Sequence, residues 1–122
     1  MPFGKILRQL IDTVPGAVGA VFADWEGEAV DQASNNGDSY HIKFLGAHHG
    51  ILLSSVNRIS DQVEMGEPRY ITIKTEKTDY YTTPIHDGYF VVLAVKSGNA
   101  PQGLAHFALK KAVKHIRDEM GF

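Results

Sequence analysis

The sequence predicts an α+β fold in a single domain spanning residues 1–122, with the element order αββαβββα. Three segments repeat apolar residues at helical spacing, and five others are short apolar or alternating runs that are typical of strands. Turn signals, not long crossovers, separate most consecutive strands, which favours antiparallel pairing. We therefore expect a five-stranded antiparallel sheet with one helix on one face and two helices on the other.

The three predicted helices begin and end at capping or helix-breaking residues. They cover residues 3–14, 40–65 and 102–120. Pro15 stops the first helix, because proline cannot continue helical hydrogen bonding. Asp38 or Ser39 can cap the second helix, and Pro101 stands near the start of the third.

The five predicted strands differ in how deeply they should be buried. They cover residues 16–23, 28–33, 69–75, 78–85 and 89–95. The last of these is the most apolar run in the chain, so we expect it to be the central strand. The run 69–75 alternates apolar and polar residues, as a half-buried strand does.

Composition excludes several classes of function. The chain has 12 Lys and Arg against 14 Asp and Glu, so it lacks the basic field that non-specific nucleic-acid binding needs. It has no cysteine, which excludes disulfides, thiolate metal sites and cysteine nucleophiles. No apolar run approaches the ~18 residues of a membrane span. We therefore expect a cytoplasmic protein that binds no nucleic acid and does not insert into a membrane.

No sequence motif for catalysis, cofactor binding or metal binding is present. The phosphate loop G-x-x-x-x-G-K-[ST], the dinucleotide motif G-x-G-x-x-G, the zinc motif H-E-x-x-H and the nucleophile elbow G-x-S-x-G are all missing. His41, His48 and His49 share the second helix, but His41 and His48 stand about 10 Å apart along it. We therefore predict no catalytic residue, no cofactor and no metal ion, and histidines that are solvated or at the edge of the core.

The first predicted hairpin ends in an acidic turn that also carries the tryptophan of the chain. Asp24, Glu26 and Glu28 resemble a cation site, but acidic residues in turns are more often simply solvated. Trp25 in the same turn has two interpretations of equal weight, an exposed contact anchor or a cover over the core.

The second helix carries the clearest functional pattern in the sequence. Its larger apolar residues fall on one narrow stripe that we expect to lie on the sheet: Leu45, Leu52, Val56, Ile59 and Val63. The opposite side holds small residues at Gly46, Gly50 and Ser54, although a glycine inside a helix costs up to ~1 kcal/mol relative to alanine. We interpret this small-residue stripe as a surface that a partner approaches closely, while a neutral solvent face stays the alternative.

The alternating strand adds a second candidate interface. If it lies at the edge of the sheet, its free backbone groups can pair with a second copy across a two-fold axis. The predicted dimer interface consists of Tyr70, Ile71, Thr72, Ile73 and Lys74. The alternative is an edge protected by the charges of Lys74, Glu76 and Lys77.

Two stretches of the chain resemble the roadblock/dynein light chain family. Residues 14–27 (VPGAVGAVFADWEG) are similar to the first strand and glycine-ended turn of that family. Residues 89–95 (YFVVLAV), followed by Gly103-Leu104 and a basic helix, are similar to its last strand and helix. The order of elements also agrees over nearly the whole chain.

The resemblance implies a homodimer, or a heterodimer, joined through the third strand and second helix, which regulates or scaffolds a Ras-like small GTPase. Some such members promote GTP hydrolysis by repositioning residues of the GTPase, so this chain would not itself be an enzyme. The positions that match the partner surface of the family are Gly46, Gly50, Leu53, Ser54, Asn57 and Arg58. Arg58 is also a candidate arginine finger, which would stabilise charge during phosphoryl transfer.

Two other functions stay open from the sequence. One is a structural adaptor subunit of a larger motor or signalling assembly. The other is a small-molecule sensor with a pocket beside the sheet, for which the candidate lining residues are Tyr80, Tyr81, Tyr89 and Phe90.

Overall fold

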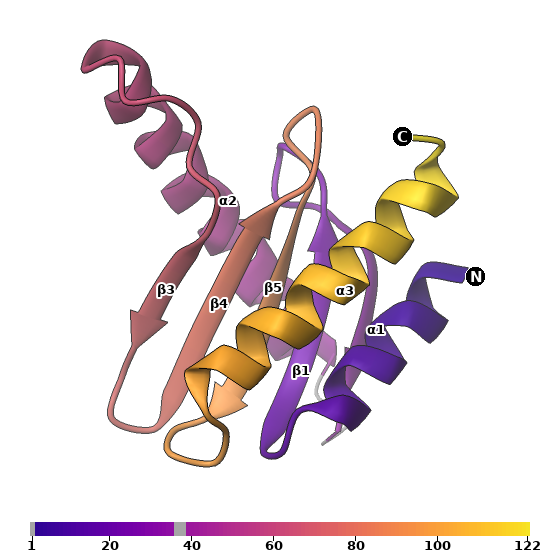
Figure 1. The fold of residues 1–122 in the computed structure, drawn as a ribbon. Helices are drawn as coiled ribbons and strands as arrows, with labels where there is room; N and C mark the ends of the chain where they lie inside the picture. Colours follow the sequence, from indigo (N-terminus) through magenta and orange to yellow (C-terminus); the bar gives the residue numbers. More distant parts are fainter. Residues whose placement is uncertain (1, 36–38) are drawn as a thin grey trace.

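The computed structural model describes residues 2–35 and 39–122 and has the α+β architecture predicted from the sequence (Figure 1). The elements are α1 Pro2–Thr13, β1 Ala17–Ala23, β2 Ala29–Ser34, α2 Ser39–Gln62, β3 Ile71–Lys74, β4 Thr78–Pro84, β5 Phe90–Lys96 and α3 Gln102–Met120. Their boundaries agree with the predicted ones to within a few residues. The predicted capping residue Asp38 lies outside the described residues.

The five strands form one antiparallel sheet in the order β2-β1-β5-β4-β3. The prediction that the most apolar run is the central strand is confirmed, because β5 has two neighbours on each side. Val91 and Leu93 of this strand are completely buried. This order leaves β2 and β3 as the two edges of the sheet.

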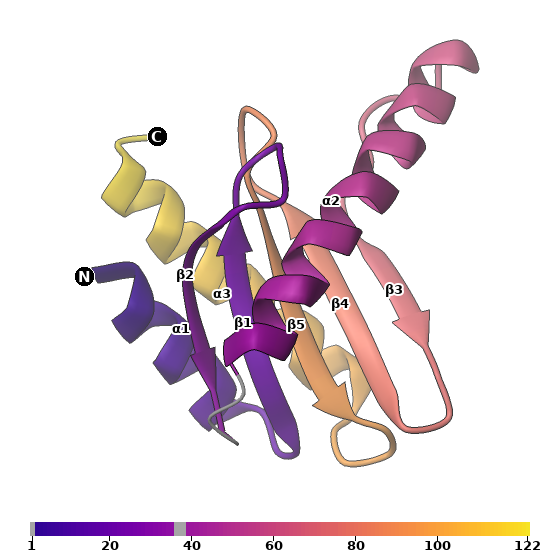
Figure 2. The same ribbon diagram turned by 180° about the vertical axis from the view of Figure 1, so that it is seen from behind.

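The helices divide two against one between the faces of the sheet, as predicted (Figures 1 and 2). α1 and α3 lie side by side on one face, over the larger hydrophobic core, with Leu7, Leu109 and Ile116 fully buried between helices and sheet. α2 alone covers the other face. A smaller core lies beneath it: Val21, Ala23, Leu53, Phe90 and Val92.

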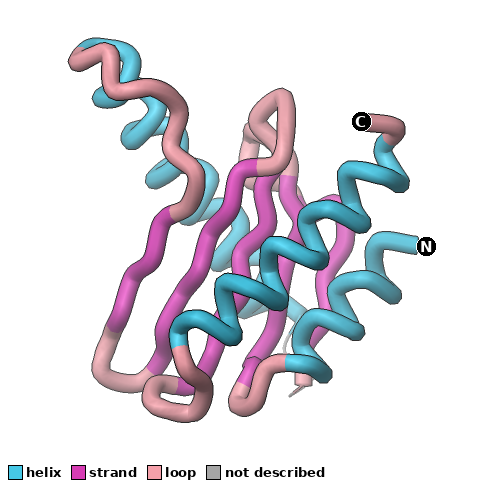
Figure 3. Tube along the Cα trace, viewed as in Figure 1, coloured by secondary structure: helices cyan, strands magenta, loops and turns pink. Residues whose placement is uncertain are grey.

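α2 is longer than the part of the sheet that supports it. Its N-terminal part packs on β1, β2 and β5, while its C-terminal half projects past the sheet on the side of β3 (Figure 2). A loop, residues 63–70, then runs back from the end of the helix to β3 (Figure 3). The side chains of Ile59 and Val63 are 59% and 54% exposed on this projecting end.

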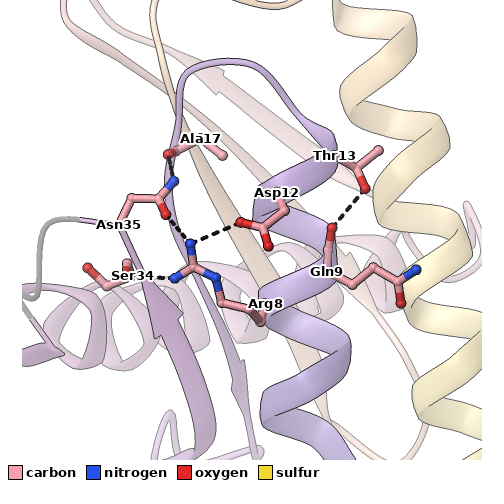
Figure 4. Close-up of polar contacts among 7 residues, drawn as sticks. All are labelled: Arg8, Gln9, Asp12, Thr13, Ala17, Ser34 and Asn35. Carbon is pink, nitrogen blue, oxygen red and sulfur yellow. Dashed lines mark hydrogen bonds and ion pairs between the residues drawn. The ribbon is translucent and has the colours of Figure 1, made fainter.

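Arg8 ties α1 to the end of β2 (Figure 4). One guanidinium nitrogen donates to Asp12 Oδ1 at 2.9 Å and to Asn35 Oδ1, and the other donates to the carbonyl oxygen of Ser34 at 3.2 Å. The Asn35 amide donates in turn to the carbonyl oxygen of Ala17 at 2.8 Å. This network joins α1, β1 and β2 at one end of the sheet, where the chain continues toward α2.

Candidate protein-interaction site

The glycines of the small-residue stripe face the sheet of their own chain, so the predicted orientation of this stripe is wrong. Gly46 and Gly50 are buried. A Cβ atom on Gly46 would lie 3.3 Å from Val21 Cγ1, and one on Gly50 would lie 3.1 Å from Gly27 Cα. Leu53, which belongs to the same predicted partner surface, is 4% exposed in the smaller core. These three residues therefore pack α2 onto the sheet and do not form an open partner surface.

The neighbour that approaches these glycines closely is the turn between β1 and β2. Gly27 in that turn has a φ of 80°, and a Cβ atom there would lie 2.7 Å from the Cα of Ala47. Small residues on both sides thus let the backbone of α2 lie almost directly on the backbone of the hairpin. The same close approach was predicted from the sequence, but toward another protein.

The larger apolar stripe is also placed differently from the prediction. Leu45 packs against the smaller core, and Leu52 and Val56 are only half-buried. Ile59 and Val63 are exposed because the sheet ends before this part of the helix. The periodic pattern predicted continuous support along the helix, but Leu53 is the last residue of α2 that is buried.

The remaining predicted partner residues do form an exposed surface. Ser54, Asn57 and Arg58 are exposed on α2, and we call these three residues the α2 ridge. The ridge separates two grooves. The first, the hairpin groove, has a volume of about 220 Å³ and is lined in part by Trp25, Ser54 and Arg58.

Trp25 supplies one wall of the hairpin groove. It has features of both interpretations that the sequence left open, an exposed contact anchor and a cover over the core. Its indole is 59% exposed, and it lies edge-on to the ring of Tyr89, with centroids 5.6 Å apart. The ring contact supports the indole on one side while the other side stays open next to Glu26 and Ile51. Trp25 was not among the predicted site residues, although its place in an acidic turn was a signal for it.

The second groove, the turn groove, lies between α2 and the turn that joins β4 to β5. Its volume is about 510 Å³, and its ionisable lining residues are Asp61, Glu67, His86, Asp87 and Arg117. Arg117 Nη1 donates to the carbonyl oxygen of Ile85 at 3.1 Å. Asp87 has a φ of 53°, a left-handed conformation that gives the turn its shape. Acidic groups outnumber basic groups here, whereas Arg58 gives the hairpin groove a cation.

The predicted dimer interface lies at the edge of the sheet. β3 pairs with β4 on one side only. Tyr70 and Lys74 are exposed, and Ile71, Thr72 and Ile73 are half-buried. The Lys74 ammonium is 3.7 Å from Asp79 Oδ2. Ile59 of α2 and Val63, which directly follows the helix, are further exposed apolar residues near this edge.

His49 is more deeply buried than the sequence suggested. Its side chain is 7% exposed, and Nδ1 lies 2.8 Å from the hydroxyl oxygen of Thr82 on β4. Burial lowers the pKa of the His49 imidazole, and the nearby His48 lowers it further. His49 is therefore a hydrogen-bonding residue between α2 and the sheet. Burial also lowers the pKa of His106, whose ring lies against Tyr70 and Tyr81.

Among residues 2–35 and 39–122, no three His, Asp or Glu side chains gather in a way that would hold a metal ion. In the same part of the chain, none of the helices combines the length and the apolar character that crossing a membrane requires.

Comparison with known proteins identifies the fold as the roadblock/LC7 fold. No protein-family model and no curated protein matches the sequence. Among solved structures, a Roadblock/LC7 domain from Streptomyces avermitilis is similar with a TM-score of 0.87 and 16% identity, over 98% of each chain. MglB from Myxococcus xanthus is similar with a TM-score of 0.86 and 14% identity, over 97% of this chain and 94% of that one.

A third solved structure, described as MglB with a tetrameric arrangement, has a TM-score of 0.82 and 13% identity, over 95% of this chain and 85% of that one. These similarities confirm, at the level of the fold, the resemblance to the roadblock/dynein light chain family that the sequence indicated.

Replacing Gly27 by alanine should destabilise the protein more than the same change at Gly66. Both residues have a positive φ, 80° and 85°, which costs alanine about 1–2 kcal/mol. Only Gly27 has backbone atoms within 3 Å of the new Cβ position, whereas nothing lies within 4 Å at Gly66. We expect losses in the free energy of unfolding of about 3 kcal/mol or more for G27A and about 1–2 kcal/mol for G66A. Urea denaturation measures both, and equal losses would contradict the close packing of α2.

Acid should weaken the fold through His49. Because folding lowers its pKa below the ordinary value of 6.5, the unfolded state binds more protons when the pH falls below that value. The contribution of neutral His49 to the free energy of unfolding is fully present above pH 6.5. It is lost as the pH falls from that value through the pKa that His49 has in the folded protein. We expect H49Q to lose less unfolding free energy than the wild type between pH 7.5 and 5.5 in urea titrations. H86Q, which changes an exposed histidine, is the control and should follow the wild type.

Proposed function

We propose that this protein is a homodimeric regulator or scaffold that binds a Ras-like small GTPase through the α2 ridge. The observation that carries the proposal is the exposure of Ser54, Asn57 and Arg58 between two grooves, on a face of the sheet that no other helix covers. The likeness to MglB and to Roadblock/LC7 domains supports a GTPase-regulator family. The resemblance implies a Ras-like GTPase as the partner.

The α2 ridge has the composition of a contact surface. Trp25 and Ile51 stand next to it as exposed apolar side chains, and such anchors beside a cationic residue supply most of the energy of many interfaces. Ser54 and Asn57 are short, so a partner surface can approach the helix closely. The hairpin groove and the turn groove then accept side chains from the partner on either side of the ridge.

Acceleration of GTP hydrolysis, where it occurs, would take place on the partner. The chain has no phosphate-binding loop, so it does not bind and hydrolyse a nucleotide by that route. Arg58 is exposed and extends from the ridge, so it serves either as a docking contact or as an arginine supplied in trans. The resemblance favours the docking function.

Self-association is proposed through β3 and the projecting end of α2. The other edge strand, β2, is flanked by α1 and α2, which both pack against it, whereas β3 packs chiefly against β4. A two-fold axis beside β3 would continue the sheet into a second copy and cover Ile71, Ile73, Ile59 and Val63. The chain is similar to that of an MglB structure described as having a tetrameric arrangement, which supports the proposal of self-association. Both α2 ridges would then lie on the same face of the dimer.

The two alternative functions have different support. A structural adaptor would use the same ridge but bind its partner equally in both nucleotide states. A small-molecule sensor has less support, since the candidate lining residues Tyr81 and Phe90 are each 1% exposed and fill the two cores, and Tyr89 lines the mostly polar turn groove.

The GTPase proposal is tested by titrating the protein with a Ras-like GTPase encoded beside it, loaded with GDP or with a non-hydrolysable GTP analogue. We expect tighter binding to the GTP form, and R58E should raise Kd by at least about tenfold, because it reverses a central charge. K77E, which reverses an exposed charge in the turn between β3 and β4, is the matched control and should leave Kd within about twofold. Equal affinity for both nucleotide forms would favour the adaptor, and no binding to either would reject the proposal.

The dimer is tested with I59D/V63D. Both side chains are more than half exposed in one copy, so the variant should fold, but the two-fold contact would bury unpaired carboxylates. We expect a wild-type mass of twice 13.4 kDa by size-exclusion chromatography with light scattering, and the monomer mass for the variant. The control V30D alters the opposite edge strand, β2, and should remain a dimer. A wild-type monomer at high concentration, or a monomeric V30D with a dimeric I59D/V63D, would contradict the proposed edge.

A further inference from the structure

Charge is divided unevenly between the two sides of the sheet. α1 and α3 carry six of the twelve Lys and Arg residues but only three of the fourteen Asp and Glu residues. The chain as a whole has a formal charge of −2, so this two-helix layer is positive and the remainder is negative. The net charge of the whole chain, from which we excluded a strongly basic protein, does not reveal this separation of charge between the two sides of the sheet.

The solvent side of α3 combines this positive charge with exposed aromatic rings. Phe107 is 68% exposed, and Lys111 and Lys114 follow it at i+4 and i+7, on the same side of the helix. The buried side of α3 does not include Phe107, because other residues of this helix lie in the core, among them Ala105, Leu109 and Ile116. Phe107 borders the groove between α1 and α3, but most of its side chain is exposed within a lysine-rich face.

The shape of this surface favours a flat partner. Its lining residues are Phe107, Lys110, Lys111, Val113, Lys114, Arg117, Asp118 and Phe122. All of them belong to α3 or to the residues that follow it directly, and α1 contributes only to a smaller groove of about 70 Å³ at the side of Phe107 and Lys111. The lysine side chains are long and stand around Phe107 on one open face, which matches a planar layer of negative charge.

We propose that this face of α3, formed by Phe107, Lys110, Lys111, Lys114 and Phe122, docks peripherally on an anionic lipid bilayer. The lysine ammonium groups meet phosphate and other anionic headgroups, and the phenylalanine rings enter the boundary between headgroups and acyl chains. The face lies on the opposite side of the sheet from α2 (Figures 1 and 2), so lipid docking leaves the α2 ridge open.

The proposal is tested by co-sedimentation of the full chain with vesicles of phosphatidylcholine alone or of an equimolar mixture with phosphatidylglycerol. We expect binding to the mixed vesicles only, and its loss at about 0.5 M NaCl. A lysine near such a surface contributes about a fivefold change in partitioning, so K111Q/K114Q should lower the partition coefficient by about 25-fold. The matched control K77Q/K96Q removes the same charge from exposed lysines outside α3 and should stay within about twofold.

F107S separates the apolar contact from the charge. The side chain is exposed, so the variant should keep the circular dichroism spectrum of the wild type but bind mixed vesicles at least about fivefold more weakly. Equal binding to both kinds of vesicle, or equal loss in K111Q/K114Q and K77Q/K96Q, would overturn the proposal. Absence of vesicle binding, with capture of poly-glutamate through the same lysines, would overturn it in favour of an acidic protein partner.

Discussion

The close packing of α2 on the turn between β1 and β2 determines which residues of this protein are available to others. Gly27, Gly46 and Gly50 remove the side chains that would hold the two backbones apart. Ser54 and Asn57 follow Gly50 at i+4 and i+7, on the same side of α2. They are nevertheless exposed, because they lie past the residues of the helix that pack on the hairpin. The position of the α2 ridge along the helix follows from this contact, because the packing of Gly46 and Gly50 fixes where α2 leaves the sheet.

The limited support beneath α2 explains the second feature of this face. The smaller core is built around Leu53 and Phe90, and Leu53 is the last buried residue of α2. Beyond it, Ile59 and Val63 are apolar but have no sheet to pack on. They emerge on the same side as β3, the edge strand that has one neighbour. Exposed apolar side chains next to free backbone groups are the usual composition of a surface that is covered by another chain.

The sheet separates two surfaces of different chemistry. On one face lies the polar α2 ridge, with Arg58 as its one charged residue and apolar neighbours beside it, and on the other lies a positive helical layer with Phe107 exposed on its outer side. The core beneath α1 and α3 is the larger of the two, so this layer is firmly attached. A protein arranged in this way can present one face to a protein and the other to an anionic surface at the same time.

The sequence by itself determined the order of elements, the antiparallel sheet, the central position of β5 and the breaks between helices and strands, because periodicity and turn residues act locally. It also identified α2 as unusual and β3 as an edge candidate. Only the tertiary structure decided the direction that α2 faces. A row of small residues looks the same whether the approaching backbone is that of the chain's own hairpin or that of a partner. An apolar stripe likewise indicates which side chains share a face of the helix, but it does not indicate how far the sheet beneath that face extends. Ile59 and Val63 could therefore not be distinguished from core residues in the sequence.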